Sequence, residues 1–293
     1  MVLGFTLNWD NTIVYLLPLI LFILIGGIPH GAVDHKLAES INNKGSNKID
    51  NFWSKYFAGI FMIAAFWIIS DVGALILFIV CSALHFGQGH FHFSTIKKKL
   101  GGPLAFALEL IWGLWLFSTL FVFNSGETQE VVNLILLSGI KMNIHAIFSF
   151  VLLISLVLLS ALFIYFKAKE LIDNKELGEQ LVQMFVITCI FYATPLLASF
   201  CIYFVFWHSI QSFYMHLDIF EHNGAKINLK RYLAIGLPFS LLAIFFILMV
   251  STSIEQDIIE SNLGWFFMGI SIISMPHMII TDEILKIDRV KSG

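Results

Sequence analysis

The chain has 293 residues, of which 58% are hydrophobic and only 13% are charged, and its formal net charge is -3. This composition excludes an ordinary soluble globular domain, and the negative charge argues against a nucleic-acid partner. Apolar runs of about 18 residues or more recur along the chain, as membrane-spanning helices require. The sequence therefore predicts an all-α, polytopic transmembrane helical bundle in a lipid bilayer.

Nine spans are expected, and together they make one integral-membrane domain over residues 1–293. In chain order they cover residues 11–33, 52–70, 72–93, 103–123, 144–166, 180–196, 198–218, 231–250 and 263–284. The segment 130–141 is too short to cross, so we expect it at the membrane interface. No Lys or Arg precedes the first apolar run and no small-residue cleavage site follows it, so we expect the first span to be retained.

The basic residues support this count. With nine spans, sixteen of the seventeen Lys and Arg residues fall on one side of the membrane, and only Lys141 falls on the other. They lie in segments 36–55, 97–99, 167–175, 226–231 and 286–291. Because Lys and Arg accumulate in cytoplasmic loops, the N-terminus is expected outside and the C-terminus in the cytoplasm.

Four histidines occupy similar places in four of these spans. His30 lies near the end of the first span, His85 in the third, His208 in the seventh and His277 in the ninth. These spans all cross in the same direction, so the histidines should meet at one depth toward the cytoplasmic side. Ionisable side chains inside a membrane usually face the bundle interior, and neutral imidazole is the commonest metal ligand. The pattern predicts a metal site, although imidazole alone does not identify the metal.

Two of these histidines follow a proline, at Pro29 and Pro276. Proline removes a helical hydrogen bond, so the first helix is expected to kink or end at Pro29, and Ile272 of the last span is expected to lose its hydrogen bond. Irregular backbone at membrane depth is tolerated where it lines a cavity or is covered by protein. Asp34 lies one turn beyond His30 and is expected to orient its imidazole as an outer partner.

Three further residues are weaker candidates. His90 follows His85 after two glycines, and it joins the site only if the helix breaks at those glycines. His216 lies two turns beyond His208 on the same helical face. Glu109, in the fourth span, either hydrogen-bonds a ligand or its surroundings, or extends toward the interface.

The motifs Pro29-His30-Gly31-Ala32-Val33-Asp34, His85-Phe86-Gly87, His208-Ser209 and Pro276-His277 resemble those of the Brp/Blh family of bacterial and archaeal membrane proteins. Members of this family are similar to β-carotene 15,15′-dioxygenases. The resemblance runs from the first to the ninth span.

The resemblance implies an enzyme of the cytoplasmic (inner) membrane that uses non-haem Fe(II) and O2 to cleave the central double bond of β-carotene into two retinal molecules. It also implies a functional link to a retinal-binding opsin. His30, His85 and His208 match the family's iron ligands. The family has a second histidine one turn after the His-Ser pair, where this chain has Ser212. The fourth ligand is therefore expected to be either His277 or His216.

Three other functions remain open from the sequence. A di-iron desaturase or hydroxylase needs clustered histidines, including an HxxHH motif that this chain lacks. A transporter of metal ions or protons would use intramembrane His, Asp and Glu, but no paired carboxylates mark a path. A non-catalytic carotenoid- or retinal-binding protein would have the same sequence features without turnover.

Overall fold

The computed structural model describes residues 22, 31–42, 51–100, 102–136, 138–252 and 259–292, and these ranges contain helices and no strand. The helices are α3 (Asp34–Asn42), α4 (Phe52–Ile69), α5 (Asp71–Phe91), α6 (Thr95–Lys99), α7 (Gly102–Phe123), α8 (Ser125–Ile135), α9 (Ile144–Ala168), α10 (Asn174–Ala193), α11 (Leu196–Tyr203), the π-helix η2 (Phe204–Ser209), α12 (Ile210–His222), α13 (Leu229–Thr252) and α14 (Ile259–Ser292). The all-α prediction is confirmed.

Six stretches of these helices are long and apolar enough to cross a membrane. Several such helices are typical of a multi-pass membrane protein. They are α4, α5, α7, α9, the run from α11 to α12, and Met268–Ile287 of α14. Helix α10 is not among them, because Lys175, Glu176 and Glu179 occupy its first two turns. The expected first span lies largely outside the described residues, so the count of nine and the orientation of the termini stay predictions.

The division between the expected sixth and seventh spans falls where the sequence places it. Helix α10 ends at Ala193 and α11 begins at Leu196, and Pro195 lies between them. Proline has no backbone N–H to donate, so it favours a helix boundary here. The short segment expected at the interface overlaps α8, which packs against α9 and α14.

Of the two predicted proline disruptions, the one at Pro276 falls among the described residues. Helix α14 continues through Pro276 without ending there. The ring of Pro276 instead packs against Gly59 of α4, where a Cβ would lie 3.0 Å from the proline Cγ. Neighbouring helices stabilise a proline inside a membrane helix. Pro29 lies outside the described residues.

Helices α5 and α7 cross with their backbones in contact. A Cβ on Gly87 would lie 1.9 Å from the carbonyl oxygen of Glu109, and a Cβ on Gly113 would lie 1.8 Å from that of Ala83. Small residues at such crossings let membrane helices approach closely. This crossing fixes the depth of the third span, which carries His85.

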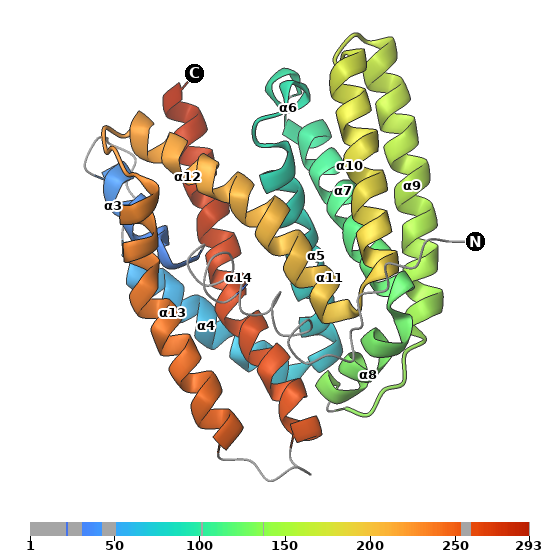
Figure 1. Ribbon diagram of the computed structural model, residues 1–293, viewed down its shortest axis with the longest axis vertical. Helices are drawn as coiled ribbons and strands as arrows, with labels where there is room; N and C mark the ends of the chain where they lie inside the picture. Colours follow the sequence, from blue (N-terminus) through green and yellow to red (C-terminus); the bar gives the residue numbers. More distant parts are fainter. Residues whose placement is uncertain are drawn as a thin grey trace.

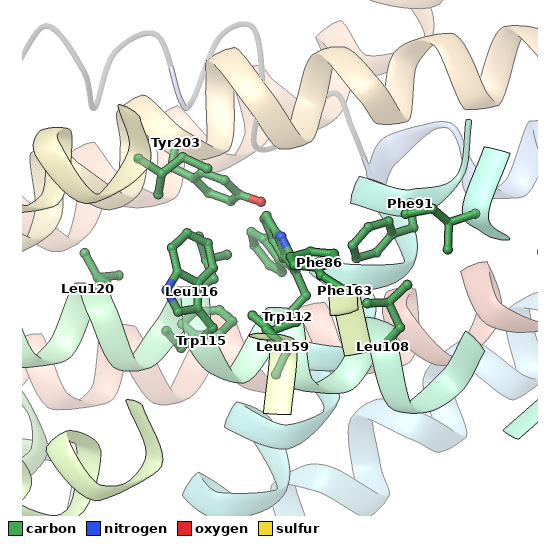
Figure 2. Packing of buried hydrophobic residues seen from close by; sticks show 14 of the residues in the cluster. Phe86, Phe91, Leu108, Trp112, Trp115, Leu116, Leu120, Leu159, Phe163 and Tyr203 are labelled. Atoms are coloured by element: carbon green, nitrogen blue, oxygen red, sulfur yellow. The ribbon is translucent and has the colours of Figure 1, made fainter. Parts of the chain in front are cut away.

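A buried apolar cluster surrounds the crossing. Figure 2 shows Phe86, Trp112 and Tyr203 among the side chains that fill it, contributed by α5, α7 and α11. On the outside of the bundle, α4 exposes Phe61 and Ile68 at 72% and 88%. Large exposed apolar side chains of this kind suit contact with lipid.

The basic residues gather at one end of the described bundle. Helix α6, the turn between α9 and α10, and the C-terminal end of α14 lie at the same end, uppermost in Figure 1. The side chain of Lys99 donates to the carbonyl of Glu170, 3.3 Å away, and so joins two of these segments. The described segments therefore agree with the predicted segregation of charge.

Replacing Gly87 or Gly113 by alanine is expected to separate α5 from α7, because the added Cβ would overlap backbone atoms. We expect a loss of about 3 kcal/mol or more in unfolding free energy. Gly178 of α10 is the matched control, since a Cβ there meets nothing within 4 Å. Alanine at Gly178 should be neutral or stabilise by up to about 1 kcal/mol. Thermal unfolding in detergent measures the difference, and equal stability of all three variants would contradict the close crossing.

Candidate metal centre

Three buried histidines from three helices lie side by side. They are His85 of α5, His208 of η2 and His277 of α14, with exposed fractions of 6%, 1% and 7%. The ring centroids of His85 and His208 are 5.0 Å apart, and those of His85 and His277 are 5.2 Å apart. The group lies where α14 and η2 pack against α5. The structure thus brings together three of the four histidines expected to meet.

The backbone around His208 and His277 leaves room for their rings. His208 belongs to a π-helical turn, a rare conformation that occurs frequently at functional sites. A Cβ on Gly89 would lie 3.5 Å from His208 Nδ1, and a Cβ on Gly31 would lie 3.5 Å from His277 Nδ1. The two glycines therefore bring α5 and the chain before α3 close to the imidazoles.

His277 is held by a buried carboxylate. Its Nδ1 lies 2.5 Å from Oδ2 of Asp34, which is 2% exposed at the start of α3, and 3.4 Å from the hydroxyl of Thr281. Because Nδ1–H donates to the carboxylate, Nε2 is the nitrogen with which His277 would bind a metal. Asp34 does orient an imidazole, but in the described structure that imidazole is His277, whereas the sequence assigns it to His30.

His216 lies in the same region. It is fully buried, and its Nδ1 is 2.9 Å from the hydroxyl of Tyr232 on α13. It is near enough to interact electrostatically with His208 and His277. The sequence offers little signal for Tyr232, because a tyrosine near the end of a span resembles the aromatic residues common at membrane interfaces.

Aromatic rings cover His208. The ring of Phe86 stacks on it at a centroid distance of 4.3 Å, and the ring of Phe204 lies 4.8 Å away. Phe22, the one described residue of the first expected span before residue 31, packs against Phe204 at 4.9 Å. One side of the histidine group is therefore apolar and excludes water.

The distances from the ring of His85 to the rings of His208 and His277 suit a shared metal ion. With nitrogen atoms about 2.1 Å from an ion, two imidazole ring centres lie about 4.6–5.3 Å apart at angles of roughly 90–110°. Both observed separations fall within this range. Within the described residues, no group of three or more His, Cys, Asp or Glu side chains has its donor atoms placed so that together they could hold a metal ion. His30, the fourth expected donor, lies outside the described residues.

Two weaker candidates have other partners. Helix α5 continues unbroken through both glycines to Phe91, so His90 points about 140° away from His85 around the helix. Its ring stacks on Trp112 at 3.8 Å, and its Nε2 lies 2.7 Å from Oε1 of Gln180. The helix break that would have brought His90 into the group does not occur.

Glu109 forms a buried ion pair with Lys97 of α6. The lysine also donates to the carbonyl of Gln88, 3.3 Å away. No described contact joins Glu109 to the three grouped histidines. Its carboxylate instead fixes α6 against α7, next to the crossing at Gly87.

Comparison with known proteins places the chain in a family. The family model described as Beta-carotene 15,15'-dioxygenase matches residues 21–284, which include all the candidate ligands. No curated protein matches the chain, and no solved structure matches it.

Replacing Asp34 by asparagine should weaken Fe(II) binding about 10- to 100-fold, as loss of an outer partner of a metal-binding histidine does. The reason is that the carboxylate fixes both the orientation and the protonated nitrogen of His277. Asp218→Asn is the control, because that carboxylate is half-exposed and pairs only with exposed His222 among the described residues. Titration of each purified variant with Fe(II) gives the affinities. Equal affinity of Asp34→Asn and wild type would exclude this role for Asp34.

Proposed function

The chain belongs to the beta-carotene 15,15'-dioxygenase family, and we propose that it cleaves the central 15,15′ double bond of β-carotene with O2 to give two molecules of retinal. The single observation that best supports this reaction is the group of buried imidazoles inside an apolar helical bundle. In the balanced reaction the double bond breaks and each of its two carbons receives one oxygen atom.

We propose that His30, His85, His208 and His277 bind non-haem Fe(II), with His216 as the alternative to His277. When bound, Fe(II) supplies the redox chemistry needed to react with O2, and imidazole ligands suit it. Neutral imidazole is the form of histidine that binds metals. The ring of His277 lies 5.2 Å from that of His85 and is held by a carboxylate, whereas the described ring contact of His216 is with Tyr232; these contacts favour His277 over His216.

The apolar surroundings suit a hydrocarbon substrate. β-Carotene carries no group that a charged or hydrogen-bonding side chain could recognise, so shape and apolar contact must position it. Phe86 and Phe204 provide flat apolar surfaces beside His208. We propose that the polyene enters from the lipid and lies against these rings, with its central double bond near the imidazoles.

The protein's contribution is alignment and exclusion of water. Asp34 keeps the proton on Nδ1 of His277, and the buried rings beside His208 limit access of solvent. Glu109 is proposed to support the site indirectly through its ion pair with Lys97. We further propose a location in the cytoplasmic membrane and supply of the retinal to an opsin.

Expression in a bacterium that makes β-carotene tests the reaction. The wild-type chain should convert β-carotene into retinal, and alanine at His85, His208 or His277 should reduce retinal formation more than the roughly 10- to 100-fold caused by loss of an outer partner. His222→Ala is the control, because His222 is half-exposed at the end of α12. Retinal and β-carotene are measured in extracts at matched amounts of membrane-inserted protein.

Two results would contradict the proposal. Persistent β-carotene with no retinal, although wild-type protein is present in the membrane, would favour a non-catalytic carotenoid-binding protein. Full activity of any one of the three alanine variants would remove that histidine from the ligand set.

A further inference from the structure

Two serine hydroxyl groups beside His208 are buried without a partner. The Oγ atoms of Ser209 and Ser212 make no hydrogen bond to the described part of the chain. Ser212 is only 1% exposed. It lies one helical turn beyond His208 and one turn before His216, so all three share a helical face. The hydroxyl of Ser212 therefore lies on the helix face that carries two buried imidazoles.

Several other helical hydroxyl groups of the described chain are paired within their own helix. Thr119, Ser160, Thr188 and Ser274 each donate to the carbonyl four residues earlier, at 2.7 Å. Ser212 does not make this bond, although it is far more deeply buried than Ser160. Because an unpaired buried hydroxyl is unfavourable, a ligand held on this face of the helix would gain a hydrogen bond from Ser212.

A third unpaired oxygen lies on the other side of the histidines. Oδ1 of Asp34 is buried and has no hydrogen-bond partner among the described residues, whereas Oδ2 is bonded to His277. Ser212 on the side of His208 and Asp34 on the side of His277 thus make the surroundings of the imidazoles partly polar. The aromatic rings of Phe86 and Phe204 cover His208 as well. The region combines an apolar wall with hydrogen-bonding groups.

We propose that Ser212 donates a hydrogen bond to an oxygen ligand held beside His208. This inference rests on the proposed function. β-Carotene is a hydrocarbon and has no acceptor, so the substrate polyene cannot satisfy the hydroxyl. The acceptors that the reaction brings to this place are a diatomic oxygen ligand and the aldehyde oxygen of retinal. Ser212 is a binding residue for that oxygen and holds it in a fixed direction relative to His208.

The structure offers a matched control for Ser212. Ser118 of α7 is also 1% exposed, and its hydroxyl also lacks a hydrogen-bond partner within the described ranges. Ser118 follows Phe117, a residue of the buried apolar cluster. It has no described contact with the histidines. Ser118→Ala removes the same group from an equally buried position without touching the proposed oxygen site.

The experiment compares wild type, Ser212→Ala, Ser212→Thr and Ser118→Ala as full chains in lipid nanodiscs. One arm measures the binding of all-trans-retinal, with β-carotene as the ligand that lacks oxygen. The other arm measures the dissociation constant of nitric oxide, a diatomic probe, for Fe(II)-loaded protein. Iron content and retinal formation from β-carotene are recorded for every variant.

Loss of one neutral hydrogen bond should weaken binding about three- to tenfold. We expect this loss for Ser212→Ala in the retinal arm, the nitric oxide arm or both, and the affected arm identifies the acceptor. Binding of β-carotene and the iron content should stay unchanged, Ser212→Thr should restore the affinity, and Ser118→Ala should behave as wild type.

The inference is wrong if wild type binds neither probe, or if Ser212→Ala binds both as tightly as wild type. It is also wrong if Ser118→Ala weakens binding as much as Ser212→Ala, since the effect would then be a general loss of packing. These results differ from failure of the proposed function, in which wild-type protein forms no retinal from β-carotene.

Discussion

The buried hydrogen bond between Asp34 and His277 is the contact on which the arrangement of the candidate centre depends. Moving a carboxylate out of water is unfavourable unless a partner satisfies it, and inside a membrane bundle the alternatives are few. The two residues are 243 positions apart in the chain. Their contact therefore joins the start of α3 to the middle of α14 and sets the direction of the imidazole. Breaking it would leave an unpaired group in an apolar interior.

Close helix crossings also position His277 and His85, whereas His208 lies in a π-helical turn. The ring of Pro276, which precedes His277, packs against Gly59. Gly87, two residues after His85, lies against the backbone of α7. His208 comes from a π-helical turn that lies between α11 and α12. Each crossing is adjacent in sequence to a histidine. The packing that stabilises the bundle is thus the packing that positions the imidazoles.

The sequence predicts the fold class and the meeting of the histidines because both follow from strong constraints. Long apolar runs have few structural solutions, and histidines in spans that cross in the same direction must lie at related depths.

The partners of the side chains are harder to predict. Nothing in the spacing assigns Asp34 to His277, because a contact between distant segments depends on how α3 docks. His90 points away because α5 tolerates two glycines without breaking, as neighbouring helices hold it. In the sequence, Ser212 is noticeable only because it replaces a histidine of the family motif. That its hydroxyl is unpaired follows only from the packing around it.

X-ray absorption spectroscopy of the iron-loaded protein tests the central claim most directly. If His85, His208 and His277 bind the metal, the spectrum should show nitrogen neighbours about 2.1 Å from the iron together with the outer-ring scattering of at least three imidazoles. A protein that retains no iron, or an iron shell made mainly of carboxylate oxygen or sulfur, would contradict this account.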